Sequence, residues 1–540
     1  MRHFPTIRRA LPFLVLALAL PLAAQDDPVL QAMKAELQRS KEKLQLEQMQ
    51  RPFFIEYRIA DDDSFSSEAV FGALRLEQRA RARLLRVTVR VGDYKQDSSA
   101  GAGDGVLDLA PEENDVMAIR HRIWLATDQA YKNAIEALSR KQAALKQFEN
   151  EAMPDDFSHE KPVESIQPLA KLEVDAPRWQ AALKSATSLY RSDAALEMLD
   201  ARTSFRAQNR YLVNSEGTVL RQSEVIYSVS VNAVAQCPDG MRVQKGYART
   251  VLKPSDLPSA DEMRASTQKV IDLLAELRKA PLMEDEYRGP VLLAPDAADA
   301  VVARLIGSPV LGRRPRPGVT TRTTGDFASS WKQHVLPDFI DVTDDPTVET
   351  AAGRALLGYY HHDDDGVPAS AVKVITHGTL TNYLMGRQPI RDFPASNGHG
   401  RGLASSGTGP TVGNLFVKST APMTFDELKK KLIDMCKDRG QPYGYLAQSA
   451  SGMRPEPLYR VYVDGHQELV RGAEFYQLDS RAMRSALIAA GSDEVASNHL
   501  DGAPHSIIVG SLLFDELEIH KTPVGREKLP DYPAPPIKGN

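Results

Sequence analysis

Residues 345–417 contain the densest set of chain-reversing signals in the sequence, and these signals restrict the segment to short strands joined by tight turns. The acidic turn DDDG occupies 363–366, and residues 371–375 alternate apolar and polar side chains as in a half-buried strand. A His-Gly pair then fits a two-residue hairpin turn. The loop SNGHGR follows at 396–401. Polar, glycine-rich loops on short strands often carry binding groups, so we expect a binding site in this segment.

The chain has 540 residues, which is too long for one hydrophobic core, so we expect at least two domains. Helical and strand-like stretches in both halves predict an α+β fold. Residues 25–280 are expected to form a mixed α/β domain with long helices. Residues 285–521 are expected to form a β-rich domain, either barrel-like or built on a mixed sheet. Residues 522–540 are proline-rich and are expected to form an extended tail.

Hydrophobic periodicity predicts the individual elements. Helices are expected at 28–50, 112–150, 179–199, 257–279, 296–306, 425–439 and 479–490. Strands are expected at 53–59, 68–77, 84–91, 204–214, 218–221, 225–235, 291–293, 458–463, 469–470 and within 506–519. In the second helix the expected core contacts are Trp124, Ala130, Ile135, Leu138 and Leu145.

The N-terminus has the pattern of a cleavable signal peptide, residues 1–24. Arginines precede an apolar run at 11–22, and small residues follow it at 23–24. The run is too short to span a bilayer comfortably, and no later stretch is long enough. We therefore expect a mature chain that begins near Gln25, has no transmembrane anchor, and is periplasmic or secreted.

The two cysteines and the net charge limit the partners and the chemistry. Cys237 and Cys436 lie in different expected domains; one disulfide between them is an alternative, but two buried free thiols are the expected state. The net charge is −5, which gives no reason to expect a nucleic-acid partner, because nucleic acid calls for a basic face.

The motifs of the turn-rich segment also carry a family resemblance. The D-D-D-G-x-P turn, the hairpin and the S-N-G-H-x-R loop resemble the C-terminal domain of the TldD/PmbA family, and the similarity continues at 414–417, 469–473 and 511–519. It covers about residues 200–520. That family contains zinc metallopeptidases and their non-catalytic partner subunits. The resemblance implies paired subunits that enclose a chamber for a peptide.

The zinc ligands of the active family members are not found where the resemblance would place them. A His-Glu-x-x-x-His motif is expected on the helix after the 291–293 strand, but neither 303–307 nor 294–298 supplies a histidine. A third ligand, a Cys in the loop before the last strands, is also missing, because 498–505 reads NHLDGAPH. The chain thus resembles the non-catalytic branch, and we predict no zinc cofactor and no peptidase activity by this chain alone.

The residues offer two other kinds of chemistry, a metal site with different ligands and a serine nucleophile. The first is a metal site with a different ligand set, which would use His361 and His362 beside the acidic turn and His399, His499 or His505 as further ligands. None of these residues has the spacing of a known ligand motif. The alternative interpretation, which we prefer, is a solvated acidic turn. Ser329 and Lys332 match S-x-x-K, but the partner motifs of penicillin-interacting enzymes are missing. The arginines at 313, 314 and 316 are expected to lie on a solvated loop rather than to bind the acidic surface of a partner.

The function expected from the sequence is that of a non-catalytic subunit that binds an extended peptide or serves as a scaffold. The resemblance and the loop chemistry select four candidate peptide-binding residues, Asn397, His399, Arg401 and Asn414. For His399, structural hydrogen bonding and ligand contact stay open. The expected partner is a homologous TldD-like subunit or a second copy of this chain. The alternatives are a metallopeptidase with a divergent metal site and a structural envelope protein.

Overall fold

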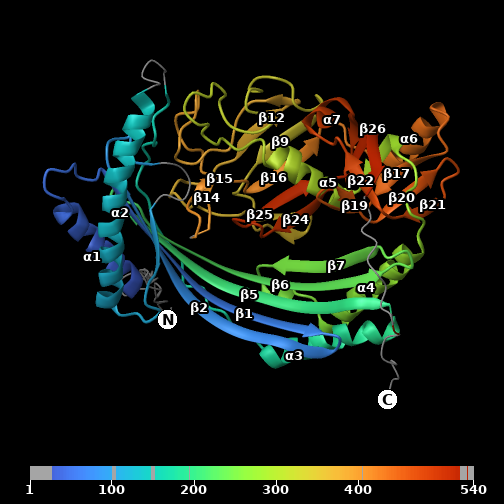
Figure 1. Ribbon diagram of the computed structural model, residues 1–540, viewed down its shortest axis with the longest axis horizontal. Coiled ribbons are helices and arrows are strands. Elements are labelled where there is room, and N and C mark those ends of the chain that lie inside the picture. The colour runs from blue at the N-terminus through green and yellow to red at the C-terminus, as the bar shows by residue number, and fades with distance from the viewer. Residues whose placement is uncertain are drawn as a thin grey trace, which may run out of the picture.

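The computed structural model describes residues 27–99, 105–146, 153–193, 195–403, 405–522 and 532. The expected signal peptide and nearly all of the expected tail lie outside these residues. The described chain forms two units: a long curved sheet with helices, and a β-rich unit that lies along it (Figure 1). The predicted α+β fold, with a mixed N-terminal part and a β-rich C-terminal part, is confirmed.

The N-terminal sheet runs in the order β3-β2-β1-β5-β6-β4, with β7 paired to β6. All neighbours are antiparallel except β4 and β6. The strands are β1 (Phe54–Val70), β2 (Ala73–Arg90), β3 (Val106–Leu109), β4 (Glu164–Ile166), β5 (Leu196–Asn214), β6 (Val219–Gln236) and β7 (Arg242–Val251). Four of them are far longer than an ordinary strand, which lets one sheet extend beneath much of the C-terminal unit (Figure 1).

One predicted strand of this sheet was wrong. Residues 68–77 contain the β1–β2 hairpin turn, where Phe71 and Gly72 have φ of 49° and 78°. The first residues of β2, 73–81, are solvent-exposed, so no apolar alternation marks where the second strand begins.

Four helices cover this sheet: α1 (Pro28–Lys43), α2 (Val116–Leu145), α3 (Ala176–Thr187) and α4 (Ala260–Lys279). The first two share one core with β1 and β2, and the last two share another with β5 and β6. Trp124 was expected in the core, but its side chain is 40% exposed on the outer face of α2. The predicted helix 179–199 ends at Thr187, and β5 begins at Leu196, because tertiary pairing with β6 takes the following residues into the sheet.

The C-terminal unit is built on two open mixed sheets. One has the order β21-β20-β17-β8-β26-β22 with β23 on β26, and the other has the order β13-β12-β9-β16-β25-β24. Neither sheet closes on itself within the described residues, so the mixed-sheet form of the prediction holds and the barrel-like form does not. The strands of these sheets are β8 (Tyr287–Leu293), β9 (Ile340–Asp344), β12 (Val372–Thr376), β13 (Thr379–Leu380), β16 (Asn414–Ser419), β17 (Tyr443–Ala447), β20 (Leu458–Tyr462), β21 (Gln467–Val470), β22 (Ala473–Tyr476), β23 (Leu487–Ala490), β24 (Val495–His499), β25 (His505–Val509) and β26 (Leu512–Lys521).

Helix α5 (Pro295–Val302) packs in the core that the two sheets share, and a π-helical turn (Ala303–Gly307) continues it. Helix α6 (Phe425–Asp438) begins at Thr424, which forms a capping box with Glu427. The predicted helix 479–490 is only one short helix, α7 (Ser480–Ser485), followed by β23. Three two-stranded ribbons complete the unit: β10 (Thr350–Ala351) with β11 (Arg354–Ala355), β14 (Gly400–Arg401) with β15 (Gly409–Pro410), and β18 (Ala450–Ser451) with β19 (Arg454–Pro455).

Cys237 and Cys436 are both free and fully buried, one in each unit, as the preferred sequence interpretation predicted. Burial raises the pKa of the Cys436 thiol to about 11, so the thiol stays protonated at neutral pH. Among the described helices, none combines the length and the apolar character needed to cross a bilayer.

Candidate functional site

A cleft of about 1080 Å³ lies between the two units. The N-terminal unit contributes the loop after β2, part of α2 and residues 153–157. The C-terminal unit contributes residues 311–317, 386–388, the β14–β15 ribbon with its turn, and residues 501–503. The size suits a ligand larger than an ordinary metabolite, because pockets for drug-sized molecules reach about 1,000 Å³.

Basic side chains dominate the cleft wall. Nine basic and four acidic residues line it, so its local charge is opposite to that of the whole chain. The basic residues are Arg90, Lys95, Arg140, Lys141, Arg313, Arg314, Arg316, Arg387 and Arg401. Within the part of the chain that the structure describes, Lys95, Arg313 and Arg316 are exposed and have no acidic partner within ion-pair distance. These three side chains carry positive charge that a bound anionic group can reach.

The loop that carries Arg313, Arg314 and Arg316 was predicted to be solvated, and it is only partly so. Arg314 is half-buried: its guanidinium lies 2.9 Å from the Asp156 carboxylate and donates to the backbone carbonyls of Pro154 and Asp155. It ties residues 153–157 to the C-terminal unit, while Arg313 and Arg316 stay exposed beside it.

The acidic turn at 363–366 was interpreted as solvated, and this is wrong. Asp363 is fully buried and accepts hydrogen bonds from the backbone N–H of Val367 and Gly400. Asp364 and Asp365 pair with arginines of the N-terminal sheet, Arg210 at 3.0 Å and Arg58 at 2.9 Å. The turn is thus a buried ionic contact between the two units.

The electrostatics of this contact follow from its composition. Burial by itself raises the pKa of Asp364, but Arg210 and Arg401 outweigh it and hold that pKa below its ordinary value. Asp365 also accepts a hydrogen bond of 2.6 Å from the Thr408 hydroxyl, which joins the turn to the β14–β15 ribbon. The same turn therefore fixes both the domain arrangement and one wall of the cleft.

Arg387 forms a second contact between the units. Its guanidinium makes two hydrogen bonds to the Glu216 carboxylate, at 2.7 and 2.8 Å, and another to the Ser158 carbonyl. It also lies over the Phe157 ring, 3.9 Å from the centroid. This planar side chain therefore holds residues 157–158 against the C-terminal unit.

His399, a predicted site residue, is fully buried and connects two loops. Its Nε2 lies 3.0 Å from Asp344 Oδ1, and its Nδ1 lies within hydrogen-bond distance of Asn397. Asp344 in turn accepts from the backbone N–H of Gly413 and Asn414. Asn397 is also used internally, because its side-chain amide donates to the Tyr383 carbonyl. These contacts favour the structural role for His399 among the two that the sequence left open.

The other two predicted site residues differ in their relation to the cleft. The Asn414 amide is buried and donates to the Val348 carbonyl. Arg401 lines the cleft, yet it donates to the Pro504 carbonyl and lies 4.5 Å from the centre of the Tyr360 ring. Of the four predicted peptide-binding residues, Arg401 alone lines the cleft. The contacts described for the four residues are all with other parts of the protein.

A group of three potential metal ligands lies at one edge of the cleft, and the sequence did not show that these residues come together. His499, Asp501 and His505, on and between β24 and β25, bring three potential ligand atoms within 4.8 Å of one another. His499 lies 3.0 Å from Asp299 of α5. Burial lowers the pKa of His505, whereas for His499 the lowering by burial is outweighed by the hydrogen bond to Asp299, which raises it.

The remaining histidines of the alternative metal site do not join this group. Among the described residues, the acidic turn offers no cluster of three metal-ligating side chains, and His399 is satisfied by Asp344 and Asn397. Helix α5 carries no His-Glu-x-x-x-His motif, so the family's zinc ligands do not fit there. Asp299 was missed because the sequence gives no sign of a partner 200 residues away.

Comparisons with known proteins agree with this geometry. Residues 286–453 match the family model described as the PmbA/TldA metallopeptidase C-terminal domain. The family model therefore supports the resemblance found in the sequence over residues 286–453. None of the curated proteins matches the chain.

Three solved structures share the fold of nearly the whole chain. A candidate modulator of a DNA gyrase from Thermotoga maritima has a TM-score of 0.60 at 13% identity, covering 91% of this chain and 99% of its own. TldE from Thermococcus kodakarensis has a TM-score of 0.60 at 11% identity, covering 90% and 99%. A candidate modulator of DNA gyrase from Bacteroides thetaiotaomicron has a TM-score of 0.58 at 12% identity, covering 91% and 98%.

Proposed function

We propose that this chain is an exported PmbA/TldD-type subunit that binds an extended, acidic peptide in the cleft between its two units. The observation that carries the proposal is the basic wall of a cleft of about 1080 Å³, with Lys95, Arg313 and Arg316 unpaired among the described residues. Carboxylates of a peptide would complement these side chains at little cost, because neither partner has to leave an existing ion pair. Its partner is a homologous subunit or a second copy, which the fold similarity to TldE supports.

The β14–β15 ribbon offers the peptide backbone a docking edge. Among the described residues, this ribbon is joined to no larger sheet, and its residues 406–411 line the cleft. An extended peptide can add to such an edge through its main chain. Of residues 371–401, which lie within the turn-rich segment of the sequence, only residues 386–388 and Arg401 line the cleft.

The test uses a fluorescent, unstructured peptide of alternating glutamate and apolar residues, with a lysine-for-glutamate version as its counterpart. We expect the acidic peptide to bind more tightly, and its affinity to fall as salt is added. Arg313→Gln combined with Arg316→Gln should weaken binding by about 3- to 10-fold, because each exposed charge pair contributes up to about 1 kcal/mol. Fluorescence anisotropy measures each affinity.

Lys430→Gln with Lys437→Gln is the matched control, since it removes the same charge from exposed positions on α6, away from the cleft. Equal losses in the two double variants would mean that net charge alone drives binding. Preference for the basic peptide would refute the proposal.

Export is a separate part of the proposal, and it rests on the signal-peptide pattern of residues 1–24. We expect the mature protein to begin near Gln25. N-terminal sequencing of the protein recovered from the periplasm or medium checks this; an intact Met1 on a cytoplasmic product would contradict it.

A further inference from the structure

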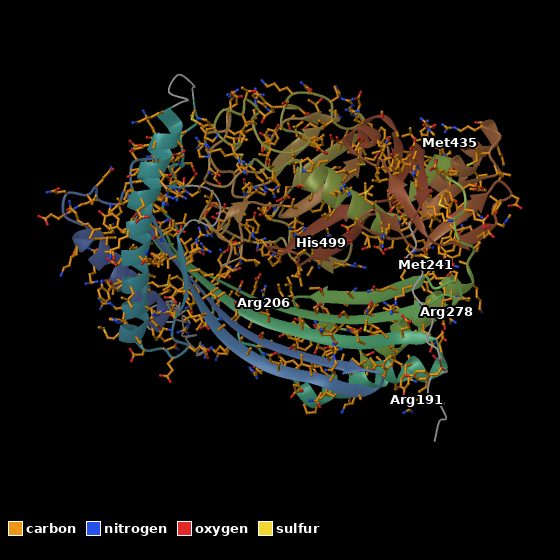
Figure 2. All side chains as sticks on the ribbon, in the orientation of Figure 1. Arg191, Arg206, Met241, Arg278, Met435 and His499 are labelled. Carbon is orange, nitrogen blue, oxygen red and sulfur yellow. The ribbon has the colours of Figure 1, made fainter. Side chains whose placement is uncertain are left out.

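The hairpin formed by β24 and β25 ends in a pair of stacked histidines. His499 and His505 are direct cross-strand partners, and their rings lie 4.9 Å apart with planes inclined by 12°. Asp501 lies in the turn that joins the two strands. Figure 2 labels His499, which lies on the side of the C-terminal unit that faces the curved sheet.

Each histidine has one ring nitrogen held by the protein. Nε2 of His499 lies 3.0 Å from the Asp299 carboxylate, and Nδ1 of His505 lies 3.1 Å from the Ala503 carbonyl. Both partners are acceptors, so each holds a ring N–H and leaves the second nitrogen with its lone pair free. Metal-binding histidines are oriented in this way, by a carboxylate or a backbone carbonyl on the far nitrogen.

We propose that His499, Asp501 and His505 form a binding site for one divalent transition-metal ion of the zinc type. Two imidazoles and a carboxylate are a ligand set that zinc accepts. Their ligand atoms lie within 4.8 Å of one another. Around a tetrahedral zinc with bonds of about 2.0–2.1 Å, ligand atoms are about 3.4 Å apart. To bind one ion, the exposed Asp501 side chain would rotate and the two stacked imidazole rings would turn toward a common point, with no change in the hairpin register.

The position of the group gives the ion an open side. Three protein ligands leave one position of a tetrahedral zinc for water or a ligand. Asp501, Gly502 and Ala503 line the large cleft, so the ion would lie at its edge. The ligand set differs from the His-Glu-x-x-x-His and Cys pattern, and it replaces the expectation of a chain without zinc. It does not depend on the proposed peptide binding.

The test is zinc binding by the mature full-length protein, after chelation and dialysis, followed by calorimetry and elemental analysis. We expect one zinc per chain. His505→Ala should remove this binding, and Asp501→Asn, at an exposed position, should weaken it. Asp299 orients His499 but does not contact the ion. Asp299→Asn keeps the shape of this side chain and removes its charge, so it should weaken zinc binding by about 10- to 100-fold. Cobalt substitution, read by visible absorption, should give the bands of a low-coordinate nitrogen–oxygen site.

His466→Ala is the matched control. His466 also has a ring nitrogen beside a carboxylate, that of Asp464, but it is not part of a three-ligand group among the described residues. The control should bind zinc as the parent does. Absence of stoichiometric zinc in the parent would overturn the proposal, and so would binding that survives His505→Ala and Asp501→Asn. If His505→Ala fails to fold by circular dichroism, the two Asn variants decide.

Discussion

Replacing Gly400 by alanine is expected to lower the free energy of unfolding of the C-terminal unit by about 3 kcal/mol or more. A Cβ at this position would lie 2.1 Å from Asp365 Oδ2 and 3.1 Å from Asp363 Oδ2. Both carboxylates are buried and already bonded, so the new methyl group must displace the contact that also holds Arg58. The midpoint of denaturant unfolding measures the effect.

Gly409→Ala is the control for this substitution. Gly409 pairs with Arg401 across the same ribbon, but a Cβ there meets nothing within 4 Å. We expect its unfolding midpoint to change little. Similar shifts in the two variants would show that backbone entropy, rather than the close approach of the carboxylates, determines the effect at Gly400.

Arg387→Met is expected to cost about 3–5 kcal/mol, because it leaves the largely buried Glu216 carboxylate without its cation. The substitution also removes the hydrogen bond to Ser158 and the contact with Phe157. Residues 153–158 should then separate from the C-terminal unit more often. We expect a lower unfolding temperature and faster cleavage of this segment in limited proteolysis.

Two variants isolate the cause. Adding Glu216→Gln to Arg387→Met should recover part of the lost stability, because the uncompensated charge is removed. Arg288→Met breaks the exposed pair with Glu516 and should change stability by at most about 1 kcal/mol. An equally large loss at Arg288 would show that burial of the Arg387 pair is not what matters.

The fold class followed from the sequence because periodicity and turn signals are local. The helices α4 and α6 were predicted nearly to their ends. The long strands were not, since β1 and β2 alternate clearly only where one face is buried. A strand whose outer half is exposed on both faces carries no apolar pattern to read.

The site was harder to predict, since its contacts join distant parts of the chain. The acidic turn looked solvated because Arg58 is 307 residues from Asp365, and Arg210 is 154 residues from Asp364. Of the predicted site residues, His399 and Asn414 were selected by motif, and both are buried. Motif position alone does not distinguish a residue that stabilises a loop from one that contacts a ligand.

Each of the large sheets is completed on one side of residues 280–286, and no strand in the described part of the chain crosses from one unit to the other. The peptide bond between the units is therefore not needed for any strand pairing. Its effect is to raise the local concentration of the two surfaces, which meet through buried arginine–carboxylate contacts. The two units of this chain thus meet as the subunits of a heterodimer do, through side-chain contacts rather than through a shared sheet.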